Sequence, residues 1–351
     1  MIRTIVTVAG FAAFAAPAFA TTYNTLSGEA PLVIAHRGAS GYLPEHTLAG
    51  YELAIKLGAD VVEPDVAITS DGHLVIMHDD SLARTTNVED LFAPRNGGYA
   101  TTDFTLAEIK SLTVEPTGTA STSYPGFTPS VSTFEVPTFE EFLTFVNDYN
   151  ETNGTNVGIY PESKPVSSTE KNQKIVEAMK TYGFTASTQN SYLQTFDHLA
   201  AQELSAMEDD LGMDVAVAAL GYVGTVDGEY AVYDYIHGSY STLSEIATYA
   251  DGVGVYKNAK LTAEFIAAAH ALGLEVHGWT FNLTDPDAAM EQYLTYIGWG
   301  LDGFFTNYTD LAVAAIAKYE AVAPVPLPAA LPMLLAGFGA FGVARTRRRA
   351  A

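Results

Sequence analysis

Short apolar runs alternate with amphipathic segments along most of the chain, and this order constrains the fold more than any other feature. Leu32–Ala35 is a continuous apolar run, typical of a strand buried on both faces. Similar runs predict strands at 60–69, 74–77, 157–161, 192–196, 215–220, 252–255, 274–280 and 303–306. Helical spacing predicts helices at 47–57, 139–150, 169–182, 198–208, 241–250, 262–272, 285–296 and 308–321. Strands followed by helices indicate an α/β fold with a parallel sheet, and this length favours a (β/α)8 TIM barrel over an open sheet.

Two stretches interrupt the alternation. Residues 84–135 are rich in Thr, Ser, Gly and Pro, and we interpret them as an insertion after an early strand. That position places the insertion over the C-terminal ends of the strands, where barrel enzymes carry their chemistry. The alternative is a surface excursion without a role. Residues 221–240, rich in Gly and Tyr, are expected to form a second long loop.

The first twenty residues read as a secretory signal peptide. Arg3 supplies the positive charge, residues 5–16 the apolar region, and Ala18-Phe19-Ala20 the cleavage site. A retained membrane anchor is the alternative. We therefore expect export, with the main folded domain at 21–324.

The C-terminal residues 325–351 form a separate segment. An uncharged stretch at 325–344 is followed by a cluster of arginines (Arg345, Arg347, Arg348 and Arg349). Twenty apolar residues can just span a bilayer, and the arginines would stay cytoplasmic. The segment resembles the VPLPA-type C-terminal sorting signals of Gram-negative bacteria, an apolar helix with an Arg-rich tail, which implies membrane contact before processing and a sorting protease besides the export machinery. A plain tail anchor is the alternative, and both predict a periplasmic, surface or extracellular domain.

Composition limits the possible partners. The 351 residues include 17 Lys and Arg against 41 Asp and Glu, a formal net charge of −24. That balance argues against nucleic acid, because phosphate backbones are bound by clustered basic residues. It is compatible with binding of a hard cation. The chain has no cysteine, so its stability does not rest on disulfides.

Charged side chains follow several predicted strands directly. If the strands form a barrel, their C-terminal ends share one rim and these side chains converge. Glu63 and Asp65 lie two apart on one strand, so both point to the same side. The groups are His36-Arg37, Glu63 with Asp65, His78-Asp79, and Glu162 with Lys164.

Together these groups are suited to metal-assisted cleavage of a phosphate ester. Three converging carboxylates, Glu63, Asp65 and Glu162, repel one another unless a cation joins them. Oxygen-only ligation favours Ca²⁺ or Mg²⁺, and no zinc-type spacing is present. His36 and His78 can divide acid and base duties near neutral pH. Arg37 and Lys164 offer positive charge to a phosphate.

The same residues carry a family resemblance. Residues 32–86, with HRG at 36–38, PEHT at 44–47, E-x-D at 63–65 and HD at 78–79, resemble the opening of glycerophosphodiester phosphodiesterases. The similarity continues with YPESK at 160–164, LQTFD at 193–197, the strand holding Trp279, and DGFFTN at 302–307. The PEHT and YPE-x-K forms resemble the secreted, periplasmic branch.

The resemblance implies a TIM barrel and hydrolysis of glycerophosphodiesters to sn-glycerol 3-phosphate and an alcohol. It implies His36 and His78 as catalytic acid and base, without deciding which is which. It implies Glu63, Asp65 and Glu162 as ligands of a divalent cation, with Ca²⁺ as first choice and Mg²⁺ as second. Arg37 would contact phosphate and Lys164 would lie beside it. Further pocket candidates are Glu45, Gln194, Phe196, His277 and Trp279.

Some questions stay open at this point. Asn307 stands where many relatives have Asp, and we expect that change to matter little. A phospholipase D-like action on lysophospholipids would use the same His and carboxylate set. A surface-displayed binding protein without activity is the alternative from another class.

Overall fold

The computed structural model describes residues 23–164 and 168–322. One compact unit, Tyr23–Tyr319, holds the sheet; the other comprises Met1–Thr22 and Glu320–Ala351, of which only 320–322 are described. The expected signal peptide at 1–20 and the segment at 325–351 therefore lie outside the described residues. Within the described ranges, no helix is both long enough and apolar enough to cross a bilayer.

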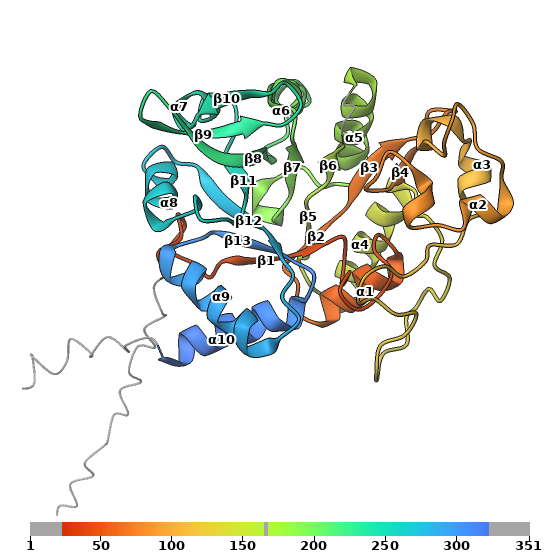
Figure 1. Ribbon diagram of the computed structural model, residues 1–351, viewed down its shortest axis with the longest axis horizontal. Helices are drawn as coiled ribbons and strands as arrows, with labels where there is room; N and C mark the ends of the chain where they lie inside the picture. The colour runs from red at the N-terminus through yellow and green to blue at the C-terminus, as the bar shows by residue number, and fades with distance from the viewer. Residues whose placement is uncertain (1–22, 165–167, 323–351) are drawn as a thin grey trace, which may run out of the picture. The chain divides into compact units, whose positions relative to one another are not determined.

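Strand pairing closes eight strand positions into a parallel barrel within the described chain. Figure 1 shows the helices arranged around these strands. β1 (Leu32–His36) pairs with β2 (Val61–Glu63) on one side and with β13 (Gly303–Thr306) on the other, so the sheet returns to its start. All neighbours around this ring are parallel. The predicted (β/α)8 barrel is confirmed. The other strands are β3 (Asp65–Ile68), which extends β2, β5 (Gly158–Ile159) extended by β6 (Glu162–Ser163), β7 (Tyr192–Thr195), β8 (Ala216–Val226), β11 (Gly252–Tyr256) and β12 (Glu275–Phe281).

The helices follow the strands as the apolar spacing predicts. The pattern at Thr138 and Glu141 forms a capping box, because the Thr138 side chain accepts from Glu141 N and the Glu141 side chain accepts from Thr138 N. The helices are α1 (Leu48–Lys56), α4 (Phe139–Asn153), α5 (Thr169–Thr181), α6 (His198–Asp210), α7 (Leu243–Ile246), α8 (Ala263–His270), α9 (Pro286–Trp299) and α10 (Thr309–Val322), with a 3-10 turn η3 (Ser187–Gln189). α7 is shorter than the predicted 241–250.

The barrel interior is filled by apolar and aromatic side chains. Buried residues from six of the strand positions, or directly beside them, meet there: Ile34, Val61, Tyr160, Tyr192, Ala218 and Phe305. Larger clusters fill the layer between the strands and the surrounding helices. Strands buried on both faces explain why the sequence shows continuous apolar runs instead of alternation.

β4 (Leu74–Ile76) is not a barrel strand, so counting it with the alternating strands was wrong. It pairs antiparallel with β3, with Val66 opposite Ile76. The turn between them is short and includes Gly72 at φ +82°. A connection this short can join only antiparallel neighbours, since parallel strands need a long crossover. β3 and β4 thus form a two-stranded ribbon at the barrel.

The insertion is a small packed lobe beside this ribbon (Figure 1). It contains α2 (Val88–Leu91), α3 (Leu106–Ile109) and a 3-10 turn η2 (Thr101–Asp103), and a further 3-10 turn η1 (Leu82–Arg84) precedes them. It has a hydrophobic cluster of its own, separate from those of the barrel: Val75, Met77, Leu82, Val88, Phe104, Ile109, Leu112, Val114 and Val136.

The prediction of a long loop at 221–240 is wrong. β8 continues to Val226 and turns through Asp227-Gly228 into β9 (Glu229–Asp234), which is followed by β10 (Ser239–Thr242). Asp227 and Gly228 have φ of +51° and +89°, as a two-residue hairpin turn requires. Asp-Gly is a strong hairpin signal, so the sequence did contain the information.

Candidate active site

The strand ends bring the predicted charged groups to one rim of the barrel. His36 ends β1 and lies opposite Glu63, the last residue of β2. Pro64 interrupts the strand, and Asp65 then begins β3 opposite Glu162 of β6. Strand register alone therefore places these four residues side by side.

Three buried carboxylates form the centre of this rim. One oxygen each of Glu63, Asp65 and Glu162 lies within 4.8 Å of the others. Burial, followed by repulsion from Asp65 and Glu162, raises the pKa of Glu63 well above its usual range. Burial also raises the pKa of Glu162 to about 7, although the Lys164 ammonium opposes this. Burial acts in the same sense on Asp65, but Lys164 and His46 outweigh it and hold the pKa of Asp65 well below its usual range.

This arrangement fits a hard divalent cation. All donors are carboxylate oxygens, which Ca²⁺ and Mg²⁺ prefer. Oε1 of Glu162 is buried and accepts no hydrogen bond, although the Lys164 Nζ lies 2.9 Å away. Three buried carboxylates so close together ionise at once only if positive charge is supplied. Glu63, Asp65 and Glu162 are the residues that would hold the cation.

His36 is held by a residue that the sequence interpretation undervalued. Its Nδ1 lies 2.8 Å from Oδ1 of Asn307, which directly follows β13. Burial, helped by the Arg37 charge, lowers the pKa of His36 to about 3, so the ring is neutral at pH 7. Asn307 is thus part of the site, contrary to the expectation that it matters little.

His78 reaches the rim from the ribbon and not from the end of a barrel strand. Because β4 runs antiparallel to β3, its C-terminal end returns to Asp65, where Met77 N donates to Asp65 O. Nδ1 of His78 lies 2.5 Å from Oδ1 of Asp79. Burial lowers the pKa of His78, while Asp65 and Asp79 oppose that shift.

Arg37 and Lys164 take different positions. Arg37 adopts a left-handed conformation at φ +60°, and its amide donates to Oε2 of Glu63 at 2.8 Å. Its guanidinium lies beside Glu45, with NH1 3.1 Å from Oε1. The Lys164 ammonium lies against the Glu162 and Asp65 carboxylates, 2.9 and 3.7 Å away. Arg37 lines the central cavity, and Lys164 is not among its lining residues.

The cavity at the rim has a volume of about 110 Å³. Drug-sized ligand sites enclose about 300–1,000 Å³, so this one suits a small ligand group. A larger groove of about 770 Å³ runs along α4 but contains none of these strand-end groups. The residues that line the 110 Å³ cavity are His36, Arg37, Glu63, His78, Glu162, Gln194, Phe196, Leu220, Trp279, Thr280 and Phe305.

Glu45 and His277 do not line this cavity. Glu45 lies behind Arg37, with Oε1 3.1 Å from NH1, and so contacts the site only through this lining residue. His277 is buried in the barrel interior, where its Nδ1 lies 3.0 Å from the Tyr160 hydroxyl. It shares a strand face with Trp279 but is two residues deeper, roughly 6–7 Å along the strand. The alternation of side chains along β12 predicts that His277 points to the same face as Trp279. Its greater depth nevertheless keeps it away from the cavity.

Aromatic side chains form an apolar wall of the cavity. Trp279 contacts Phe196, Tyr222 and Tyr256, with ring centroids 5.4, 5.5 and 5.1 Å apart. Phe196 and Trp279 line the cavity itself, while Tyr222 and Tyr256 pack against Trp279 and are partly exposed. The cavity lining therefore combines charged and apolar side chains.

Comparison with known proteins shows which family has this arrangement. Residues 36–311 match the glycerophosphoryl diester phosphodiesterase family. The chain belongs to this family. The expected family and enzyme class, a phosphoric diester hydrolase, are thereby confirmed.

Two relatives and one solved structure illustrate the similarity. A glycerophosphodiester phosphodiesterase of Haemophilus influenzae is 35% identical over 256 residues, covering 66% of this chain and 70% of the relative. One of Bacillus subtilis is 33% identical over 293 residues, covering 82% and 87%. The fold is similar to that of an Oleispira antarctica phosphodiesterase in complex with the product sn-glycerol-3-phosphate, with a TM-score of 0.58 and 23% identity, covering 84% of this chain and 99% of that one.

Several contacts in this family site come from residues that sequence reasoning did not single out. His46, at φ +59°, places Nε2 2.7 Å from Oδ2 of Asp65 and Nδ1 2.7 Å from the Tyr51 hydroxyl. Arg84 contacts both Asp79 and Glu45. His46 lies in the PEHT stretch at 44–47 and Arg84 in the stretch 82–85, but nothing in their spacing indicates a partner.

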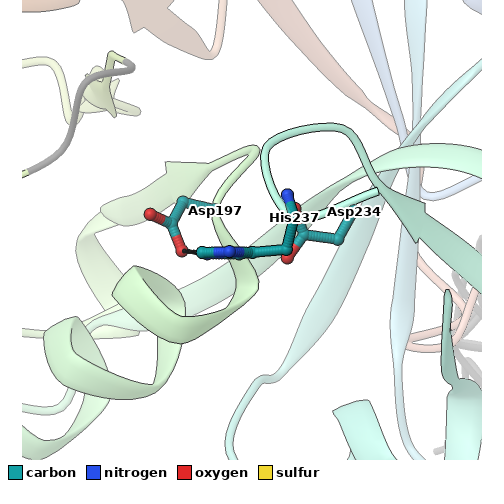
Figure 2. Close-up of side chains that lie close together, drawn as sticks. All are labelled: Asp197, Asp234 and His237. Carbon is teal, nitrogen blue, oxygen red and sulfur yellow. Dashed lines mark hydrogen bonds and ion pairs between the residues drawn. The ribbon is translucent and has the colours of Figure 1, made fainter. Parts of the chain in front are cut away.

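Asp197, Asp234 and His237 form a second cluster of potential metal ligands, which lies at the β9–β10 turn (Figure 2). The His237 ring extends from this turn to Asp197, where its Nε2 lies 3.0 Å from Oδ1. Asp197 caps α6 by accepting from Leu199 N and Ala200 N. Asp234 accepts from backbone amides at Ile236, His237 and His198. The cluster therefore anchors the β9–β10 turn to the start of α6.

Proposed function

We propose that the protein hydrolyses small, soluble glycerophosphodiesters to sn-glycerol 3-phosphate and an alcohol. The observation that carries this is one cavity lined by two histidines from different elements, an arginine, and two of three clustered carboxylates. The small volume of the cavity favours a headgroup-sized substrate over a lipid with its chain. The Oleispira antarctica structure contains sn-glycerol-3-phosphate, the product that we propose for this protein.

A divalent cation held by Glu63, Asp65 and Glu162 is part of this proposal, with Ca²⁺ before Mg²⁺. When bound, such an ion neutralises phosphoryl charge and supports the developing alkoxide as a Lewis acid. Arg37 binds a phosphoryl oxygen, since a guanidinium matches phosphate geometry.

His36 and His78 divide the proton transfers. His36, which burial keeps neutral at pH 7, removes the proton of the attacking group, either a water or the neighbouring glycerol hydroxyl. Asn307 Oδ1 accepts from Nδ1, which leaves Nε2 as the basic nitrogen. His78, paired with the Asp79 carboxylate, donates a proton to the leaving alkoxide. Each transfer contributes about 10²–10⁴-fold.

The apolar wall of Phe196 and Trp279 covers the carbon skeleton of the substrate. Because it lines the same cavity as His36, Arg37 and the carboxylates, it leaves the charged groups to the phosphate and glycerol hydroxyls. Gln194 also lines the cavity, and its Nε2 donates to Tyr160 O at 3.2 Å and lies 3.5 Å from Oε1 of Glu63.

The test is hydrolysis of glycerophosphocholine by the protein with Ca²⁺ or with EDTA. Release of sn-glycerol 3-phosphate and choline that EDTA stops and Ca²⁺ restores supports both reaction and metal. His36→Ala should abolish turnover without loss of folding, as judged by circular dichroism. Cleavage of lysophosphatidylcholine but of no soluble diester would instead support the phospholipase D-like alternative, and no turnover at all would support a binding role.

Export also belongs to the proposal. The features that support it are the signal-peptide pattern at 1–20 and the apolar, Arg-tailed segment at 325–351. Fractionation of the cells that make the protein, with mass spectrometry of both termini, tests it. A full-length chain in the cytoplasm would contradict it.

A further inference from the structure

Arg84 joins two carboxylates that belong to different parts of the site. Its NH1 and NH2 lie 3.0 and 2.8 Å from Oε2 and Oε1 of Glu45. Its Nε and NH2 lie 2.5 and 3.1 Å from Oδ2 and Oδ1 of Asp79. One guanidinium therefore makes two bidentate contacts, the strongest geometry that arginine offers to carboxylates.

These contacts lie in a chain of alternating charge. His78 contacts Asp79, Asp79 contacts Arg84, Arg84 contacts Glu45, and Glu45 contacts Arg37. The chain thus runs from an imidazole that lines the cavity to a guanidinium that lines it as well. Arg84 is the central member and touches the cavity nowhere itself.

We propose that Arg84, at the entry to the inserted lobe, is a positioning residue that holds Asp79 so that His78 presents its Nε2 to the leaving group. The inference rests on the proposed function, because it assumes that His78 transfers a proton. It also gives the insertion a role: Thr117, a second lobe residue, places its hydroxyl 3.3 Å from Oε2 of Glu45.

The positioning follows from the chemistry of Asp79. A carboxylate only accepts hydrogen bonds, so the Nδ1 beside it carries the proton and Nε2 remains the nitrogen for exchange with substrate. Asp79 is partly exposed, with 28% of its side chain accessible. Among the described side chains, Arg84 and His78 are the hydrogen-bond partners of the Asp79 carboxylate. Without Arg84, only His78 would hold this carboxylate in place.

The lobe does not depend on the guanidinium for its packing. The neighbouring Leu82 is fully buried in the lobe core, whereas the Arg84 side chain is 39% exposed. Replacing Arg84 by methionine keeps an apolar stem of similar length and removes only the charged fork. Such a variant should therefore fold.

A matched control exists in the same lobe. Arg95 makes a bidentate contact with Glu108, with NH1 and NH2 3.0 and 2.5 Å from the two oxygens, and is 37% exposed. Its contacts stay within the lobe. Arg95→Met thus removes the same chemistry at similar exposure without touching the site.

The experiment compares Arg84→Met, Arg84→Lys and Arg95→Met with the wild-type protein on glycerophosphocholine with Ca²⁺. Since a placed acid contributes about 10²–10⁴-fold, Arg84→Met should lower kcat at least about tenfold. KM should change much less, because a loss confined to the transition state lowers kcat and kcat/KM together. Arg84→Lys should recover only part, since lysine lacks the fork. Arg95→Met should keep the wild-type kcat.

A second readout does not depend on turnover. In ¹⁵N-histidine-labelled protein above about pH 8, where the His78 ring is neutral, His78 should be the Nδ1-protonated tautomer in wild type and a mixture in Arg84→Met. Unchanged kcat and unchanged tautomer in folded Arg84→Met, with active wild type, would overturn the inference. An inactive wild type whose His78 tautomer still responds to Arg84 would instead count against the proposed function.

Discussion

Asn307→Asp is the sharpest test of how the site sets the protonation of His36. The change places a carboxylate where the amide oxygen now lies 2.8 Å from Nδ1. An opposite charge this near raises the pKa of a histidine by about 1–3 units, or about 1.4–4 kcal/mol. Starting from about 3, the pKa of His36 should therefore rise to between about 4 and 6.

The assay is kcat/KM for glycerophosphocholine from about pH 4.5 to 9 with Ca²⁺ saturating. His36 acts as a base only when neutral, so activity is lost as the pH falls through its pKa. In wild type this acidic limb lies near pH 3, below the assayed range, so the profile should be nearly flat toward pH 4.5. In the variant the limb should enter the range, with its midpoint at about pH 4 to 6, while activity above about pH 8 stays near that of wild type. Asn156→Asp, the same change at an exposed position, is the control and should leave the limb in place.

Two results would contradict this reasoning in different ways. Superimposable profiles would mean that Asn307 does not set the pKa of His36, or that this pKa does not govern the rate. Higher activity of Asn307→Asp at neutral pH would mean that His36 works in its protonated form. The roles of the two histidines would then have to be exchanged.

Three further predictions concern the metal, the apolar wall and the base of the barrel. Glu162→Gln should weaken Ca²⁺ binding, measured by calorimetry, by more than the about 10–100-fold typical of outer ligand partners; unchanged affinity would exclude this carboxylate. Trp279→Ala should raise KM about 2–10-fold, the equivalent of about 0.5–1.5 kcal/mol for an aromatic contact, and a pure kcat effect would refute a binding role. Burial raises the pKa of Glu208 to about 7, so the folded state holds an extra proton between about pH 4.5 and 7 and loses stability as the pH rises. Glu208→Gln keeps the acceptor for Val215 N and should match wild type near pH 5 but be up to about 3 kcal/mol more stable near pH 8; parallel thermal melts at both values would refute this.

The barrel and the centre of its site could be predicted from sequence because both depend on strand periodicity. A run such as Leu32–Ala35 predicts a strand, and the next residue then lies at the rim. The same rule places Glu63 at the end of β2, and the continuation of the strand after Pro64 places Asp65 beside Glu162. Periodicity predicts the face of the sheet to which a side chain points. It carries no information about how deep in the barrel the residue lies, and for this reason the prediction for His277 was wrong.

The contacts that tune the site could not be predicted, since they join residues far apart in the chain. Asn307 lies 271 positions from His36, and Arg84 lies 39 from Glu45. No local propensity encodes such a pair. The hairpin at 227–228 is different: its Asp-Gly turn is a local signal, and the apolar and polar alternation around it supports the same interpretation.

The separate core of the inserted lobe affects how the activity responds to heating. His78 stands at the end of the β3–β4 ribbon, and that ribbon packs on the lobe through Val75 and Met77. Sub-global opening of this small cluster would withdraw the acid while the ring of eight strands stays intact. We therefore expect turnover to fade on warming before far-ultraviolet circular dichroism changes, so the working temperature of the enzyme is set by the core of the lobe and not by that of the barrel.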